Sequence, residues 1–361
     1  MRSEKCLKNV MKQRNAHVDY IRGIAILLVM LGHTISNNGM NDFADSGMYK
    51  VIFALQMPLF MLVSGYVTKY SRPIDSGKAL ASFFGRRSLC YLLPWGVWTL
   101  FRGFAFGGWA LGTVKNEAVS LLWNMDSGYW FLFSLWTICA VWGTGSFIAN
   151  KLTEKRVPRV ILCSVFSAAL SVGLFFVGLK AGLSFLNIKL TLYYIPFFFL
   201  GYVFASFYGT FEHGKKFRVV ETSVAALSFV AFVAITLNRN VYYLGESVSE
   251  IAIRIICSLT GCISVIFFSV KFFEEFKACA WLETLKKGVT VIGRESLGFY
   301  LIHYLFLNMI RLPAGTSFYS FEAFETCLMN YILTVLLSAV VIYIINRCAP
   351  LKAVLFGKLK K

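Results

Sequence analysis

The stretch HVDYIRGIAILLVMLGHT, residues 17–34, is apolar for most of its length but carries Asp19, Arg22 and His33. A helix crosses a lipid bilayer with about 20 predominantly apolar residues, so this stretch predicts a membrane-spanning helix. A charged side chain at the centre of a bilayer costs roughly 2.5–3.5 kcal/mol on insertion scales, so polar residues in such a helix are candidates for function. This one segment therefore indicates both the fold class and the place to look for chemistry.

Arg22 and His33 are separated by eleven positions. Eleven steps of a helix end about 20° past three full turns, so the two side chains share a face, about 16 Å apart along the axis. Asp19 lies three residues before Arg22 and is within reach of an ion pair with it. We interpret the face as a conduit in which Arg22 holds an anionic ligand and His33 acts as a base. The structural alternative is that Arg22 reaches the lipid headgroups and His33 bonds a neighbouring helix.

The composition of the whole chain agrees with a membrane protein. Of its 361 residues, 57% are hydrophobic and only 15% are charged, against about 25% charged residues in soluble domains. This excludes a soluble enzyme, a disordered tail protein and a collagen-like fibre. The nine cysteines include no C-x-x-C pair, so neither a disulfide framework nor a metal site is predicted. A signal peptide is disfavoured, because no small-residue cleavage site follows the first apolar run.

The sequence predicts an all-α, polytopic membrane protein with ten transmembrane helices. A basic N-terminus (1–19) precedes the membrane domain (20–347), and a basic tail (348–361) follows it. Two further segments, 113–125 and 273–290, have a helical pattern but are too short to span and are expected at an interface. The predicted spans lie near 20–37, 49–68, 88–107, 128–149, 159–178, 190–208, 219–237, 251–270, 290–310 and 326–346.

The distribution of basic residues predicts the orientation of these spans. The chain has 36 Lys and Arg residues against 18 Asp and Glu, a net charge of +18. With both termini in the cytoplasm, the cytoplasmic segments hold 26 of the basic residues and the outer loops hold six. Membrane proteins retain basic residues on the cytoplasmic side, so the excess of cations indicates topology in the plasma (inner) membrane. No nucleic-acid partner is expected.

Five segments together resemble the acyltransferase 3 family of integral-membrane O-acyltransferases, in its fucose 4-O-acetylase-like branch. The first is the Arg22–His33 segment. The resemblance runs from about residue 14 to the last span, and all five segments occur in the family's order. The other four are IFALQMPLFMLVSGYV (52–67), GRRSLCYLLPW (85–95), GYWFL (128–132) and IGRESLGFYLIH (292–303).

The chain departs from the family pattern at two places. Gln56 stands where the second-span motif usually has histidine, which removes a titratable group. Leu89 and Cys90 stand where the basic segment usually has a second pair of cations. Donor binding is therefore expected to depend more on the remaining pair, Arg86 and Arg87.

The resemblance implies transfer of an acyl group from acyl-CoA to a glycan hydroxyl, with acetyl the family's commonest group. Acetyl-CoA is then a substrate, and no permanently bound cofactor or metal is expected. Arg22, Arg86 and Arg87 are on the predicted cytoplasmic side, where arginine forks suit the phosphates of the donor. His33 is the predicted base for the acceptor hydroxyl, with Asp19 as the partner of Arg22. A covalent acyl-histidine relay is the variant left open.

Acceptor-binding residues are expected near the outer ends of the helices. Gln56 is at the level of His33 and is suited to bond a sugar hydroxyl. Ser296 and His303 are seven residues apart on the ninth span, with Tyr300 close to the same face. Tyr129 and Trp130 open the fourth span. The structural alternatives are an interhelical hydrogen bond for His303 and an ordinary aromatic belt for the pair at 129–130.

Two other classes of function compete with the acyltransferase interpretation. A transporter or flippase for a polar lipid or glycan would also use Arg, His and Glu inside the membrane, although the sequence shows no paired interrupted helices or repeat halves. A scaffold of an envelope-polymer complex would tolerate loss of both Arg22 and His33. The expected partners are acyl-CoA, a carbohydrate or lipid-linked sugar acceptor and the bilayer, with a homo-oligomer left open.

Overall fold

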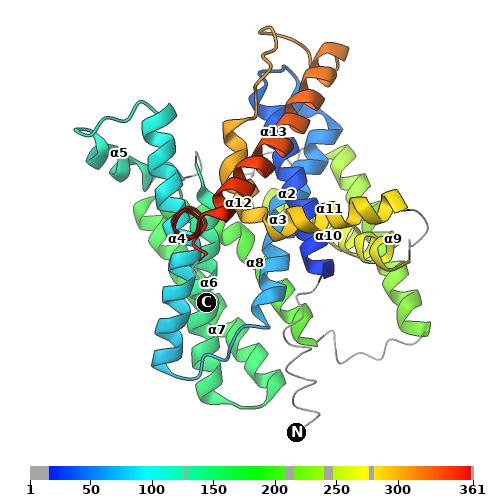
Figure 1. The fold of residues 1–361 in the computed structure, drawn as a ribbon. Helices are drawn as coiled ribbons and strands as arrows, with labels where there is room; N and C mark the ends of the chain where they lie inside the picture. The colour runs from blue at the N-terminus through cyan, green and yellow to red at the C-terminus, as the bar shows by residue number, and fades with distance from the viewer. Residues whose placement is uncertain (1–15, 126–127, 208–214, 240–246, 276–279, 359–361) are drawn as a thin grey trace. The chain divides into compact units, whose positions relative to one another are not determined.

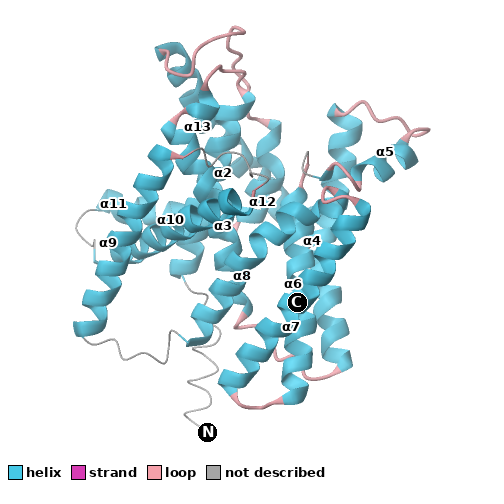
Figure 2. Cartoon of the chain, turned by 180° about the vertical axis from the view of Figure 1, so that it is seen from behind, coloured by secondary structure: helices cyan, strands magenta, loops and turns pink. Residues whose placement is uncertain are grey.

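The computed structural model describes residues 16–125, 128–207, 215–239, 247–275 and 280–358. Within these ranges helices and short loops make up the chain, with no strand (Figures 1 and 2). The elements are α2 (Ala16–Asn37), η1 (Phe43–Asp45), α3 (Gly47–Thr68), α4 (Gly77–Phe106), α5 (Val114–Leu121), α6 (Trp130–Leu152), α7 (Arg156–Ala181), η3 (Phe185–Asn187), α8 (Ile188–Phe207), α9 (Lys215–Asn238), α10 (Val248–Glu275), α11 (Ala280–Arg294), α12 (Ser296–Ile302), η5 (His303–Leu305), α13 (Phe321–Arg347) and α14 (Ala349–Phe356).

Eight helical segments among the described residues are long and apolar enough to cross a membrane. They correspond to predicted spans one, two, four to eight and ten. The all-helical, multi-pass membrane class predicted from the sequence is therefore confirmed, while the count of ten and the orientation remain predictions. The segments are Ala16–Asn37, Gly47–Thr68, Trp130–Leu152, Arg156–Ala181, Phe185–Phe207, Val219–Asn238, Val248–Phe272 and Phe321–Arg347.

The remaining two predicted spans differ from each other. The third lies within α4, a helix of 30 residues, and Arg102 with several Trp and Tyr residues makes it less apolar than the eight. The prediction of the ninth span as one helix over 290–310 was wrong. Helix α11 ends at Arg294, the short α12 ends at Ile302, and a 3-10 turn at His303–Leu305 follows.

The chain divides into two compact units, and the division falls inside α3 and α13. The first unit contains residues 1–63 and 213–336. Within it, α2 is an interior helix, with 67% of its apolar segment buried, whereas α9 buries only 22% of its segment. A helix that is apolar all round but little buried presents its side chains to lipid. Helix α2 is therefore the central element of the first unit.

Helix α11 crosses α2 at two glycines, and Figure 1 shows it lying across α2. A Cβ atom placed on Gly293 would lie 1.7 Å from the Asp19 carbonyl oxygen, and one on Gly23 would lie 2.1 Å from the Val289 carbonyl oxygen. Small residues let membrane helices approach until their backbones touch. The contact fixes where α12, which follows α11 directly, begins.

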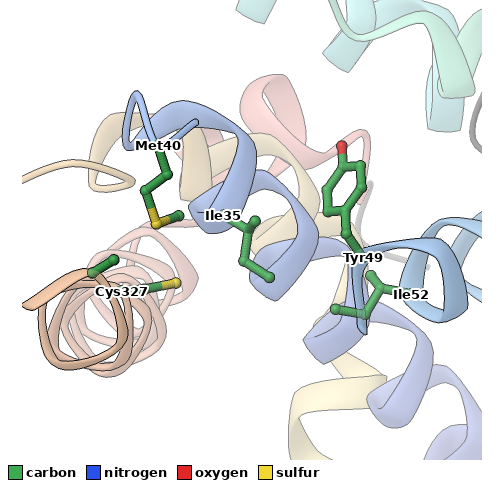
Figure 3. Packing of buried hydrophobic residues seen from close by; sticks show 6 residues of the cluster. Ile35, Met40, Tyr49, Ile52 and Cys327 are labelled. Carbon is green, nitrogen blue, oxygen red and sulfur yellow. The ribbon is translucent and has the colours of Figure 1, made fainter. Parts of the chain in front are cut away.

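The other end of α2 is held by a hydrophobic cluster (Figure 3). Ile35 of α2 and Met40 just beyond it pack with residues of α3 and α13. The connection is strengthened by two backbone hydrogen bonds, in which the Asn41 N–H donates to the Thr316 carbonyl and the Phe318 N–H donates to the Asn41 carbonyl. The buried members of the cluster are Ile35, Met40, Tyr49, Ile52, Ala323 and Cys327.

The second unit contains residues 64–212 and 337–361. Its centre is α6, which packs against α4, α7 and α8. The buried Ser134 hydroxyl accepts hydrogen bonds from the Asn187 amide at 3.0 Å and the Thr191 hydroxyl at 2.9 Å. Helix α14 lies in the predicted basic tail and packs on α4, where the Trp98 indole N–H donates to the Leu355 carbonyl at 3.0 Å.

We predict that Gly293→Ala disrupts the first unit. The added methyl group would overlap the α2 backbone, and overpacking of this kind costs about 3 kcal/mol or more. Fluorescence-detected size-exclusion chromatography of the full chain should show loss of the monodisperse peak.

Gly288→Ala on the same helix is the matched control, because a Cβ there meets nothing within 4 Å. It should be neutral or slightly stabilising, since alanine favours a helix over glycine by about 1 kcal/mol. Equal behaviour of the two variants would contradict the close crossing.

Candidate functional site

The rings of His33, His303 and Tyr304 lie together in the first unit. The Tyr304 hydroxyl oxygen lies 3.0 Å from His33 Nε2 and 3.4 Å from Nδ1, within hydrogen-bond distance. The ring centroid of His33 is 4.8 Å from that of Tyr304 and 5.3 Å from that of His303. The structure therefore brings the predicted base and the predicted C-terminal histidine side by side.

The tautomer of His303 is fixed by its backbone partner. His303 is fully buried, and its Nδ1 lies 2.9 Å from the Phe299 carbonyl oxygen. A carbonyl only accepts, so Nδ1 carries the proton and Nε2 carries the lone pair of the neutral ring. Nε2 has no hydrogen-bond partner among the residues that the structure describes. An unsatisfied buried acceptor costs about 1–3 kcal/mol, so its lone pair is a candidate ligand-binding atom.

Gln56 of α3 supplies a second unsatisfied acceptor, next to Gly32 of α2. Its Oε1 is buried and has no hydrogen-bond partner among the described residues. A Cβ atom on Gly32, the residue before His33, would lie 2.9 Å from this oxygen. Because Gly32 has no side chain, the Gln56 amide packs directly against α2. The role of Gln56 in acceptor binding stays a prediction.

The rings of two successive residues, His303 and Tyr304, both contact His33. Successive side chains point about 100° apart on an α-helix and about 120° apart on a 3-10 helix, so neither backbone alone brings the two rings together. Their ring centroids nevertheless lie 4.4 Å apart. Tyr304 was not predicted from the sequence, although it directly follows the motif histidine.

The other two predicted residues of this segment are on α12. Tyr300 is buried, with its ring centroid 6.1 Å from that of His303. Ser296 is half-buried at the first residue of the helix. Tyr300 therefore belongs to the ring cluster, and Ser296 lies about two turns away along the chain.

A polar clamp holds the segment that follows the 3-10 turn. We use this name for Asn38, Asn330 and Thr334. The Asn330 amide donates to Asn38 Oδ1 at 2.7 Å and to the Ile310 carbonyl at 2.8 Å, and its oxygen accepts from the Ile310 N–H at 2.9 Å. Asn38 donates to the Leu307 carbonyl at 3.2 Å, and Thr334 donates to the Phe306 carbonyl at 2.9 Å. Neither asparagine was singled out from the sequence.

The start of α2 carries the predicted acidic residue and the first arginine. Asp19 is buried, and its Oδ2 lies 3.4 Å from Nε of Arg294, an ion pair between α2 and α11. The predicted pairing of Asp19 with Arg22 stays a prediction beside this ion pair. Arg22 is half-buried at the next turn of α2. Because α2 is one helix from Ala16 to Asn37, the eleven positions between Arg22 and His33 amount to about 16 Å along its axis.

The two predicted donor-binding arginines of the second unit differ in their surroundings. Arg86 is exposed. Arg87 is half-buried and donates to the Tyr91 hydroxyl at 3.0 Å and to Ser71 Oγ at 3.5 Å. Its guanidinium also lies 5.2 Å from the ring centre of Phe83. Arg86 is therefore the more available of the two cations.

More positive charge gathers just beyond α3 in the second unit. Burial, followed by the positive charges of Arg156 and Arg159, lowers the pKa of Lys69. Like charges disfavour one another's ionised forms. Lys69 and its neighbours thus form a cationic surface that a negatively charged group would stabilise.

The predicted aromatic residues of the fourth span are engaged with other rings. Tyr129 is only 2% exposed and its ring centroid lies 6.3 Å from that of Trp98. Trp130 is half-buried and stacks on Tyr194 at 5.5 Å with an interplanar angle of 23°. Their roles as a sugar platform remain predictions.

The arrangement around His33 suits proton transfer to and from a hydroxyl compound. It offers two imidazoles, a phenol and a carboxamide, with lone pairs at His303 Nε2 and Gln56 Oε1. Within the described part of the chain, no three His, Cys, Asp or Glu residues gather as a metal site. The chemistry offered by these side chains is general acid–base chemistry.

Comparison with known proteins gives a family for this arrangement. Residues 15–347 match the family model described as "Acyltransferase domain". The chain is 27% identical to nodulation protein NolL of Mesorhizobium japonicum over 232 residues, which cover 61% of this chain and 55% of that protein. It is 30% identical to nodulation protein NolL of Sinorhizobium fredii over 210 residues, covering 53% and 49%. The matches thus span about half the length of these relatives. No solved structure matches the chain.

We predict that Asn330→Ala loosens the clamp and destabilises the first unit. The change leaves the buried Asn38 Oδ1 and the part-buried backbone groups of Ile310 without their partner, at a cost of about 1–3 kcal/mol. Thermal unfolding of the full chain in detergent should show a lower midpoint.

Asn238→Ala is the control, because its amide is exposed and, within the described part of the chain, donates to the Ala234 carbonyl one turn earlier. It should leave the midpoint unchanged. An unchanged midpoint in Asn330→Ala as well would mean that the clamp contributes no stability.

Proposed function

Because the chain belongs to the acyltransferase domain family, we propose that it transfers an acetyl group from acetyl-CoA to a sugar hydroxyl. The acceptor is a cell-envelope glycan or glycolipid at the outer face of the plasma membrane. The observation that carries this proposal is the cluster of His33, Tyr304 and His303, with an unpartnered acceptor at His303 Nε2.

In the proposed reaction His33 is the general base. The proton of the acceptor hydroxyl passes to the His33 imidazole while the hydroxyl oxygen attacks the carbonyl carbon of the thioester. A C–O bond forms, the C–S bond breaks, and the proton leaves His33 to complete the thiol of coenzyme A. Neutral imidazole suits this exchange because it accepts and returns a proton near neutral pH.

The sugar substrate is assigned to the two buried atoms that lack a hydrogen donor. A sugar presents several O–H donors, and such a ligand would pair with His303 Nε2 and Gln56 Oε1, which have no partners among the described residues. Burial of these atoms strengthens the bonds they make with a ligand. Tyr300, Ser296, Tyr129 and Trp130 complete the residues proposed for acceptor binding.

Acetyl-CoA, the acyl donor, is assigned to arginines on the predicted cytoplasmic side. Arg22 is on the same helix as His33, and Arg86 and Arg87 are on α4. Phosphate oxygens match the fork of a guanidinium. The extended pantetheine arm of coenzyme A is comparable in length to the distance of about 16 Å between Arg22 and His33 along α2.

We predict that His33→Ala abolishes transfer. Membrane vesicles from cells producing the full chain, which contain the native acceptor, receive radiolabelled acetyl-CoA, and label in glycan and glycolipid fractions is counted. Loss of the base should lower incorporation by about 100-fold or more.

His17→Ala, at the start of the same helix, is the control and should retain full incorporation. Label incorporation by His33→Ala at the control's level, with equal amounts of protein, would rule out His33 as base and as acyl carrier. Transport of an unlabelled glycan without any acetylation would favour a carrier instead.

We predict that Arg86→Ala raises the KM for acetyl-CoA by about tenfold, with little effect on kcat. A hydrogen bond between charged groups contributes about 1.5–3 kcal/mol, and 1.4 kcal/mol is a tenfold change in binding. The measurement is the initial rate in the vesicle assay at several donor concentrations.

Arg87→Ala should raise the KM and also lower thermal stability, because its guanidinium bonds Tyr91 and Ser71. Lys115→Ala, which removes an exposed cation of α5, is the control for charge alone. If Arg86→Ala and Arg87→Ala both leave the KM unchanged, as Lys115→Ala should, the donor phosphates do not bind at Arg86 and Arg87.

A further inference from the structure

The end of α14 packs on the face of α4 that carries Arg86. A Cβ atom on Gly357, the residue after α14, would lie 2.1 Å from the Leu89 carbonyl oxygen and 2.9 Å from the Cys90 Cα atom. The Cys90 thiol also donates to the Gly357 carbonyl at 3.7 Å. Arg86, Leu89 and Cys90 are at positions i, i+3 and i+4 of α4, a spacing that places side chains on one face. We call the contact of Gly357 with Leu89 and Cys90 the α4–α14 joint. It lies about one turn of α4 from Arg86.

The joint requires glycine for two independent reasons. Gly357 has a φ of 60°, in the left-handed region that glycine adopts without strain and that often ends a helix. It is also buried against the backbone of α4, which leaves no room for a side chain. Further along α4, the Trp98 indole N–H donates to the Leu355 carbonyl at 3.0 Å. These contacts hold the end of α14 in one place on α4.

Lys358 follows the joint directly. Its side chain is half-buried, and its Nζ lies 5.8 Å from the centre of the Phe356 ring, a cation–π contact. Because Phe356 is fully buried, the Lys358 ammonium group is held against the end of α14. Arg86 of α4 and Lys358 of the tail thus flank the same joint, although they come from distant parts of the sequence.

Two cations beside one joint favour an anion there. Like charges disfavour one another's ionised forms, and a bound anion offsets that cost. Phosphate oxygens accept hydrogen bonds from both a guanidinium and an ammonium group. Arg86 is exposed, so a ligand can reach it. The chemistry of the pair therefore matches a phosphate group better than a neutral one.

We propose that the end of α14 is part of the donor site, where Lys358 and Arg86 together bind a phosphate group of acetyl-CoA. Gly357 is the positioning residue that keeps Lys358 beside α4. This inference rests on the proposed O-acetyl transfer, and it adds the C-terminal tail to the donor site assigned to Arg86.

The first test measures donor binding without transfer. The purified full chain is placed in nanodiscs of phosphatidylcholine, whose headgroups carry no net charge, and the Kd of coenzyme A is measured by calorimetry. Lys358→Ala should raise the Kd by about tenfold, as loss of a charged hydrogen bond does. Lys358→Arg, which keeps the charge, should stay within threefold of the wild type.

Lys78→Ala is the matched control for charge. Lys78 is an exposed lysine of α4, eight positions before Arg86 and thus about 12 Å away along the helix axis. Its removal should leave the Kd unchanged. In the vesicle assay, Lys358→Ala should raise the KM for acetyl-CoA by the same factor as the Kd and keep kcat.

A second variant tests the joint. In Gly357→Ala the added methyl group would overlap the α4 backbone and strain the left-handed turn, so the Kd should rise as in Lys358→Ala although Lys358 is intact. Gly96→Ala is the glycine control on α4, because a Cβ there meets nothing within 4 Å, and it should keep the wild-type Kd. If Gly357→Ala does not fold, Lys358→Ala decides the question.

A Kd for Lys358→Ala within twofold of the wild type in these nanodiscs would overturn the inference. A raised KM in the native vesicles alone would also overturn it and would assign Lys358 to the headgroup of an anionic lipid. Failure of the proposed function is distinguishable from both, because it would appear as a wild-type chain that binds coenzyme A but transfers no acetyl label.

Discussion

The contact between the backbones of α2 and α11 is the constraint on which the candidate site depends. At Gly23 and Gly293 no side chain separates the two helices, and the Asp19–Arg294 ion pair closes the same crossing. Because α12 and the 3-10 turn follow α11 without a long loop, this crossing determines where His303 and Tyr304 meet α2. Close packing, rather than a hydrophobic driving force, is what holds helices together in lipid. A site assembled by such packing tolerates little displacement.

Polar groups in the first unit are satisfied where they support the site and left unsatisfied within it. Asn38, Asn330 and Thr334 have well-formed bonds to the segment after the 3-10 turn. His303 Nε2 and Gln56 Oε1, in contrast, are buried and have no hydrogen-bond partners in the part of the chain that the structure describes. Stability alone would favour pairing or removing such atoms. In the proposed function these two atoms accept hydrogen bonds from the hydroxyl groups of a sugar.

The amino-acid sequence predicted the membrane class and eight helices that are long and apolar enough to cross a membrane, because these depend on local hydropathy and on the period of a helix. It failed where neighbouring helices decide the backbone. The break at Glu295 and the 3-10 turn at His303 interrupt an apolar run that reads as a continuous span. Tyr304 and Asn330 went unnoticed for a related reason. Their importance lies in partners 271 and 292 positions away, which no local pattern contains.

The most direct test of the central claim is mass spectrometry of the envelope glycans of the host with and without the gene. If the chain is an O-acetyltransferase, glycans from the strain that lacks it should lose an acetyl-sized mass from one sugar, and the wild-type gene should restore it. Glycans of identical mass in both strains, with the glycan retained on the cytoplasmic side in the strain without the gene, would contradict acetyl transfer and identify a carrier.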